Sequence, residues 1–83
     1  MSKLQIAVLD RGFVYVGKVS RQGDDLVIED AKNVRRWGTE RGLGQLASEG
    51  PQPNTRLDPT PLITAPLKSL IYLIDCEPSK WAA

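Results

Sequence analysis

The sequence predicts a mainly β fold, a curled sheet or small barrel of about five mostly antiparallel strands that carries one short helix at about residues 40–49. Three observations predict it. Segments rich in β-branched and aromatic residues recur along the chain with alternating apolar side chains. Short turns containing glycine and aspartate separate the first three of these segments. Only one segment has the apolar spacing of a helix, and 83 residues suffice for a single domain, 1–83.

Residues 1–34 are predicted to form a β-meander. Its three strands are residues 4–10, 13–20 and 26–34, joined by tight turns at 10–12 and 21–25. In the first strand Leu4, Ile6 and Val8 share one face of the sheet. Gly17 interrupts the second strand and is expected to mark a β-bulge.

Residues 35–50 are predicted to form a glycine-rich turn and a short helix. Leu43, Leu46 and Ala47 recur at the i, i+3, i+4 spacing of one helical face. A helix of about two to three turns is not stable alone, so this apolar face is expected to pack on the sheet.

Both ends of this helix carry sequence signals. Thr39 is expected to cap the first turn, with Glu40 at the positive end of the helix dipole. Gly50 followed by Pro51 predicts the end of the helix, because glycine adopts the left-handed cap conformation and proline cannot continue the helix.

The C-terminal half is predicted to contain one loop and two strands. Residues 51–61 are rich in proline and are expected to be an extended surface loop, not a strand. Residues 62–76 are expected to form two strands separated by Pro66. The second of them, residues 67–76, is apolar on both faces, so we expect it to be central in the sheet or to lie beneath both the helix and a partner subunit. Residues 77–83 are a tail in which Trp81 is too large to remain without packing.

Composition and charge exclude several classes of protein. The chain has 11 basic and 10 acidic residues and a net charge of +1, unlike the strongly basic face of a protein that binds duplex nucleic acid. No apolar run reaches the roughly 18 residues of a membrane span, and the N-terminal segment lacks the apolar core of a signal peptide. We therefore expect a cytoplasmic protein without a membrane partner.

Cysteine, histidine and acidic residues limit the chemistry. One cysteine, Cys76, and no histidine exclude an internal disulfide, a Cys/His zinc site and a histidine base. Cys76 is expected to be a small buried residue rather than a nucleophile. The adjacent pairs Asp24 with Asp25 and Glu29 with Asp30 lack the geometry of an acid/base pair and the spacing of a calcium loop. We expect no enzyme activity, metal or cofactor, and we expect an oligomer interface to support so small a core.

The segment GLGQLA, residues 42–47, matches the G-x-G-x-x-A form of the dinucleotide-binding fingerprint. That fingerprint requires a preceding strand, a long helix and a second parallel strand with an acid about 20 residues on. Here a proline-rich stretch follows a short helix, and the chain is too short for such a sheet. We interpret the match as chance.

A candidate ligand site surrounds the start of the helix. Glycines there allow backbone N–H groups to approach an anion, and arginine suits bidentate phosphate binding. The tryptophan offers a stacking face for a base. The candidate residues are Arg35, Arg36, Trp37, Arg41, Gly42, Gly44 and Arg56. In the alternative interpretation the arginines are a solvated strand end and Trp37 belongs to the core.

Three segments, in their order and spacing, resemble a family of small domains of unknown function found in bacteriophages and prophages. They are DAKNV, then WGTERGLGQLASEG with the pattern W-x5-L-x2-L-A-x-E-G, and finally LKSLIYLIDC. The positions that carry the resemblance are Asp30, Ala31, Val34, Trp37, Leu43, Gln45, Leu46, Ala47, Glu49, Gly50, Leu67, Ile71, Ile74 and Cys76. The family often has an aromatic residue where this chain has Arg35 or Arg36, so the candidate site is more basic here.

The resemblance implies a phage setting, the cytoplasm of an infected host cell, and a β-rich fold, and it supplies no established catalytic role. By analogy of setting, small phage proteins include counter-defence factors, among them oligomeric sponges that sequester cyclic nucleotide or cyclic ADP-ribose signals. We therefore expect a homo-oligomeric accessory protein that sequesters an anionic, nucleotide-like ligand. The alternative is an inhibitor of a host protein or a virion accessory factor, which would dock through a strand edge, Trp81 and the proline-rich loop.

Overall fold

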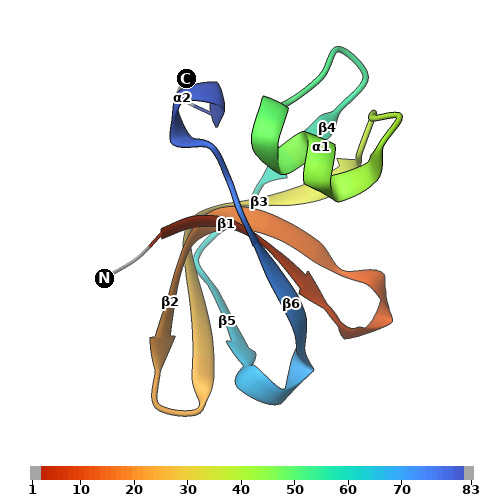
Figure 1. Cartoon of the computed structure of the whole chain (residues 1–83). Coiled ribbons are helices and arrows are strands. Elements are labelled where there is room, and N and C mark those ends of the chain that lie inside the picture. The colour runs from red at the N-terminus through yellow and green to blue at the C-terminus, as the bar shows by residue number, and fades with distance from the viewer. Residues whose placement is uncertain (1–2, 82–83) are drawn as a thin grey trace.

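The computed structural model describes residues 3–81 and contains a single antiparallel sheet that carries its helices at one end (Figure 1). Its elements are β1 (Lys3–Leu9), η1 (Asp10–Gly12), β2 (Val14–Gln22), β3 (Asp25–Arg36), α1 (Gly42–Glu49), β4 (Arg56–Pro59), β5 (Ile63–Pro66), η2 (Leu67–Ser69), β6 (Leu70–Asp75) and α2 (Pro78–Trp81). The strand order is β4-β3-β2-β1-β6, and β5 also pairs with β3. The predicted mainly β fold, the meander of β1 to β3 and the one short helix on the sheet are confirmed. Of the two predicted forms, the curled sheet is right and the closed barrel is wrong.

A bulge bends β2 and β3 together. Their register shifts between Val16 and Lys18, where Gly17 alone faces Asp30 and Ala31. A bulge is therefore present at Gly17, as predicted, but its extra residue is on β3. A Cβ atom on Gly17 would lie 2.6 Å from Cγ2 of Ile28, which leaves room for glycine alone. On the facing strand Asp30 has a φ of 51°, in the left-handed region. Because a bulge increases the local twist, the long hairpin curls and the sheet follows it.

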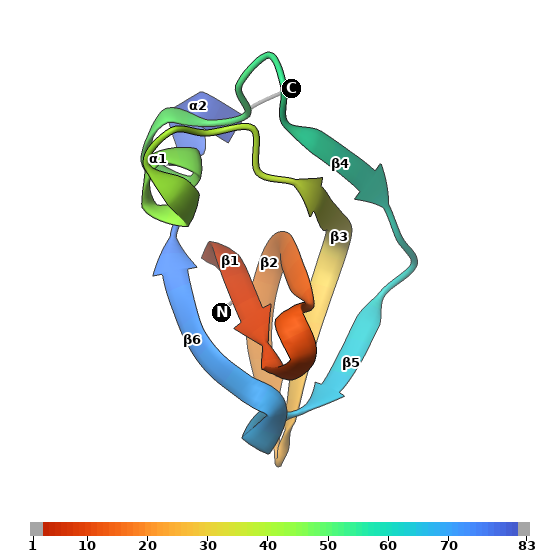
Figure 2. The ribbon, with the colours of Figure 1, turned by 90° about the vertical axis from the view of Figure 1, so that its right-hand side faces the viewer.

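The curl gives β3 two further partners on its outer side. Residues 25–28 of β3 pair with β5, and residues 32–36 pair with β4. The edge formed by β4 and β5 lies opposite the edge formed by β6, and η2 connects the two (Figure 2). The candidate arginines are therefore at the β3–β4 end of this arrangement.

The prediction that residues 51–61 contain no strand is wrong, because β4 lies inside that stretch. β4 is a short edge strand with Leu57 as its single apolar residue, so it lacks the alternation that signals a strand. Pro59 is its last residue, a position at an edge where a missing N–H is tolerated.

The predicted last strand differs from the structure in two ways. Its first residues form η2, and β6 begins at Leu70. The predicted central position is wrong, since among the described strands β6 pairs with β1 alone, while its end lies beneath α1. The curl explains why both faces are apolar: Leu73 contacts one core cluster and Ile74 contacts the other.

Two apolar clusters stabilise the fold, one on each face of the sheet. The first lies beneath α1 and buries Ile6, Val14, Val16, Val34, Leu43, Leu46, Ala47 and Cys76. The second is enclosed by the curl of the sheet and buries Ala7, Leu9, Val19, Leu26, Ile28, Ala31 and Ala65. The predicted faces of β1 and of the helix are confirmed.

The C-terminal segment closes over the end of α1. The indole Nε1 of Trp81 donates a hydrogen bond to the carbonyl oxygen of Ala47 at 3.1 Å, and the Glu77 N–H donates to the same oxygen at 2.9 Å. Gly50 ends the helix, as predicted, but its φ of 82° and ψ of 180° are not the predicted left-handed cap conformation. A Cβ there would lie 2.3 Å from the carbonyl oxygen of Lys80. The predicted packing of Trp81 is confirmed.

Candidate anion-binding site

Three of the predicted arginines come together where β3 meets β4. Arg35 and Arg36 end β3, and Arg56 begins β4. Arg36 and Arg56 are directly opposed in the antiparallel register, so their side chains share one face of the sheet. Arg35 forms an ion pair with Asp58 of β4, with 3.4 Å between Nη1 and Oδ2. Strand pairing thus unites residues that are far apart in the sequence.

Arg36 and Arg56 lack acidic partners. Within residues 3–81 neither guanidinium lies within ion-pair distance of a carboxylate. Like charges that are directly opposed in a sheet repel each other, at a cost of roughly 0.2–1 kcal/mol relative to an apolar pair. A bound anion would remove this repulsion and would accept charge-assisted hydrogen bonds from both side chains.

These arginines line a hollow of about 480 Å³ together with Arg35 and Asp58. Three guanidinium groups face one carboxylate there, so the hollow is positively charged. Its volume lies within the range of small-molecule sites, about 300–1,000 Å³.

A second, larger hollow of about 630 Å³ adjoins the first, and Arg36 lines both. Its lining is polar and consists of Arg36, Gly38, Thr39, Glu40, Gln45, Gln52, Pro53 and Asn54. The amide side chains of Gln45, Gln52 and Asn54 can each donate and accept hydrogen bonds. A ligand that reaches from the first hollow into the second would therefore meet charge at one end and neutral polar groups at the other.

The walls of the larger hollow are held together by Gly38 and Thr55. Gly38 has a φ of 66°, and a Cβ on it would lie 2.3 Å from the backbone nitrogen of Thr55. The Thr55 hydroxyl donates to the carbonyl oxygen of Trp37 at 2.7 Å and accepts from the Gln52 N–H at 2.8 Å. These contacts dock the loop before β4 on the segment before α1.

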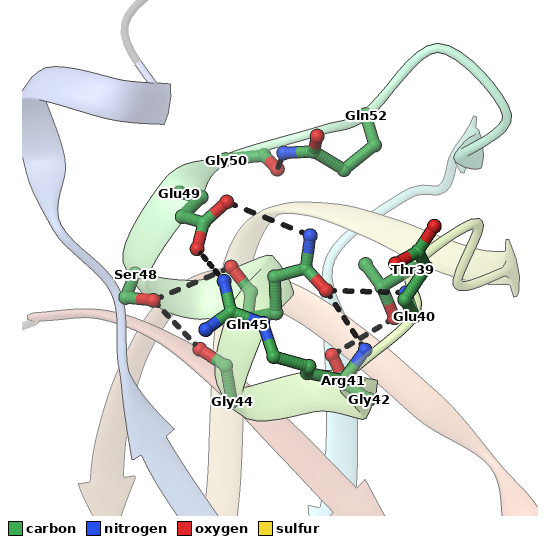
Figure 3. Close-up of polar contacts among 10 residues, drawn as sticks. All are labelled: Thr39, Glu40, Arg41, Gly42, Gly44, Gln45, Ser48, Glu49, Gly50 and Gln52. Atoms are coloured by element: carbon green, nitrogen blue, oxygen red, sulfur yellow. Dashed lines mark hydrogen bonds and ion pairs between the residues drawn. The ribbon is translucent and has the colours of Figure 1, made fainter.

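The start of α1 is capped differently from the prediction. Thr39 is not the cap: its hydroxyl donates to the carbonyl oxygen of Gly42 at 2.9 Å. The Oε1 atom of Gln45 instead accepts the backbone N–H groups of Glu40 at 3.1 Å and Arg41 at 2.8 Å (Figure 3). These two N–H groups are already bonded, which weakens the predicted role of the helix start in holding an anion. The Gln45 side chain accepts N–H groups that precede the helix, much as the glutamine of a capping box does. Its position near the first turn could therefore have predicted this cap from the sequence.

The remaining predicted site residues are not among those that line the two hollows. Arg41 forms an ion pair with Glu49 along the outer face of α1 (Figure 3). The side chain of Trp37 lies beside Gly42, and Trp37 remains 44% exposed. Trp37, Arg41, Gly42 and Gly44 line neither hollow. The structure therefore unites Arg35, Arg36 and Arg56 and separates the other four, and Trp37 belongs to neither the core nor the hollows.

Sequence reasoning missed Asp58, Gln52 and Asn54. All three lie in the proline-rich stretch, residues 51–61, that was expected to be an extended surface loop. Asp58 follows Arg56 at the i, i+2 spacing of one strand face, which would have been informative had the strand been recognised.

Two side chains with shifted pKa values lie at the opposite edge of the sheet. Hydrogen bonds from Gln5 and Lys3 lower the pKa of Asp75. Burial, together with the charge of Asp75, raises the pKa of the Cys76 thiol to about 11. Among residues 3–81 no group of three or more Cys, Asp or Glu side chains is placed to hold a metal ion.

Comparisons with protein-family models, with curated proteins and with solved structures find no match. No helix in the described part of the chain is long and apolar enough to cross a membrane.

Proposed function

We propose that the protein is a non-enzymatic binding protein for an anionic, phosphate-bearing ligand, held at the hollow formed by β3 and β4. The observation that carries the proposal is the direct opposition of Arg36 and Arg56, neither of which has an acidic partner in residues 3–81. A phosphate group between them accepts bidentate hydrogen bonds and neutralises a repulsive pair.

The adjoining polar hollow supports a nucleotide-like ligand rather than phosphate alone. Arg36 lines both hollows, so a phosphate at Arg36 leaves the rest of the ligand against Gln45, Gln52 and Asn54. Amide side chains suit the hydroxyl and carbonyl groups of a sugar or base. Binding of this kind needs no general base, in keeping with a chain that has no histidine.

In the phage setting that the resemblance implies, such a protein sequesters a nucleotide signal of host immunity. The alternative, a protein that docks on a host protein, is less well supported. Trp81, one of its expected docking residues, is partly buried and bonded to Ala47, and part of the proline-rich loop is β4.

The test is a titration of the full chain with inorganic pyrophosphate, ADP-ribose and a cyclic dinucleotide at low salt, followed by calorimetry and thermal melting. Binding stabilises the folded state by mass action, so the melting temperature rises with ligand concentration. Arg36→Gln should weaken binding by about 1.5–3 kcal/mol, roughly ten- to a hundredfold in Kd.

Arg41→Gln is the matched control, because Arg41 lies close in the sequence but pairs with Glu49 on the helix. It should leave Kd unchanged. If none of the three probes binds, or if both substitutions weaken binding equally, the proposed site is wrong.

A further inference from the structure

The two edges of the sheet differ in how they are protected. On one edge β4 and β5 are four residues each, and each ends in a proline, Pro59 or Pro66. Short strands, prolines and charged side chains are the features that keep an edge from pairing with another chain. On the other edge β6 has the sequence LIYLID, which contains no proline, lysine or arginine.

The free side of β6 presents unpaired backbone groups. The Cys76 N–H donates to the carbonyl oxygen of Leu4 in β1 at 3.1 Å. Since backbone groups alternate in direction along a strand, those of Ile74 face β1 and those of Leu73 and Asp75 face away. Among the described strands none pairs with this side.

Apolar side chains are also exposed along β6. Ile71 is 60% exposed and Tyr72 is 49% exposed, and they are adjacent in the strand. Tyr72 is near the middle of the strand. The register of β6 against β1 shifts at Ile71, and Asp75 is the one charged residue of the strand, so the regular apolar part of this edge is residues 72–74. An open, mostly apolar edge strand is a template for strand addition.

We propose that the free edge of β6 pairs antiparallel with β6 of a second copy of this chain, centred near Tyr72, to form a two-fold symmetric dimer with one continuous sheet. The charges favour a second copy. Lys68 precedes the strand and Glu77 follows it, and both are exposed, whereas Asp75 at the end of the strand already pairs with Lys3 of β1. Antiparallel pairing brings the basic start of one strand beside the acidic end of the other, and both ends of the interface benefit because it is isologous.

The dimer leaves the candidate anion site open. The smaller hollow lies at the end of the sheet where β3 meets β4, and β6 is at the far end of the strand order. The dimer therefore goes beyond the proposed function and does not depend on it. It also covers the apolar β6 edge and leaves exposed the edge that prolines protect.

Sedimentation velocity and equilibrium on the full chain, from micromolar to millimolar concentration, test this proposal. The protein should sediment as a monomer and dimer in equilibrium. Ile71→Lys introduces an edge charge and should weaken dimerisation by about tenfold or more. Leu62→Lys is the matched control, since Leu62 is 59% exposed but lies next to β5 on the protected edge, and it should have no effect.

Hydrogen exchange on the unaltered chain provides a second measurement that needs no variant. Protection of the Leu73 and Asp75 amides should rise with protein concentration, while that of amides in β4 stays constant. A monomer at every concentration overturns the proposal. So does association that Leu62→Lys abolishes and Ile71→Lys leaves intact, or association that continues beyond the dimer into open polymers.

Discussion

Gly38 lies so close to Thr55 that a Cβ atom on Gly38 would be 2.3 Å from the Thr55 backbone nitrogen. The loop before β4 and the segment before α1 therefore meet backbone to backbone. Because these two segments form the walls of the larger hollow, the shape of the candidate site depends on a residue that lacks a side chain.

Gly38→Ala should lower the free energy of unfolding by about 2–5 kcal/mol. The left-handed φ of 66° costs an alanine about 1–2 kcal/mol, and the contact with the Asn54–Thr55 peptide adds about 1–3 kcal/mol. Urea denaturation measures the change.

Gly23→Ala is the matched control, since Gly23 has a φ of 58° but nothing within 4 Å of its Cβ position. Its cost should be about 1–2 kcal/mol from the backbone alone. Equal losses in the two variants would show that the loop is not docked as described.

Trp81→Phe should lower the free energy of unfolding by about 1 kcal/mol. Phenylalanine retains most of the apolar contact with the core beneath α1 but removes the Nε1 donor to the Ala47 carbonyl oxygen. The exposed Trp37 supplies the control, and Trp37→Phe should change stability by less than about 0.5 kcal/mol. Chemical denaturation followed by circular dichroism compares the two without relying on tryptophan emission. A larger loss from the Trp37 variant would contradict the packing of the C-terminal segment.

Features set by local periodicity could be predicted from the sequence. Leu4, Ile6 and Val8 share a face because strand geometry places every second residue together, whatever the rest of the chain does. Leu43 and Leu46 face the sheet for the corresponding reason in a helix.

Features set by pairing between distant segments could not be predicted in the same way. Nothing local to residues 56–59 signals a strand, and β4 exists because the end of β3 offers it a partner. The same pairing decides which arginines meet. Arg41 is nearer to Arg36 in sequence than Arg56 is, but helix geometry turns Arg41 toward Glu49 while strand register sets Arg56 opposite Arg36.

Asp58→Asn should tighten pyrophosphate binding by about two- to fivefold, because it removes the one carboxylate among the three arginines of the smaller hollow. Stability should change by less than about 0.5 kcal/mol, since the Arg35–Asp58 ion pair is exposed. Calorimetric titration at low salt measures the affinity, and the gain should shrink as salt is added. Asp24→Asn, at the exposed turn between β2 and β3, controls for net charge. An equal gain in that variant would mean that overall charge, not the hollow, governs binding.

Cys76 should make the fold sensitive to alkaline pH. Burial, and next the charge of Asp75, raises the pKa of the folded thiol from its ordinary value of 9.0 to about 11. The unfolded chain therefore loses the thiol proton first as the pH rises. The stabilisation associated with the protonated thiol is complete below pH 9 and is lost between pH 9 and about 11. A pKa rise of two units in one group corresponds to a stability change of no more than about 2 kcal/mol after allowance for partial solvent screening.

Urea denaturation of the wild type and of Cys76→Ala at steps across this pH range measures the change in stability. The alanine variant should lose a constant amount of stability to its cavity and show a shallower decline with pH than the wild type. Parallel curves would show that the thiol ionises equally in the folded and unfolded chains and would contradict its burial beneath α1.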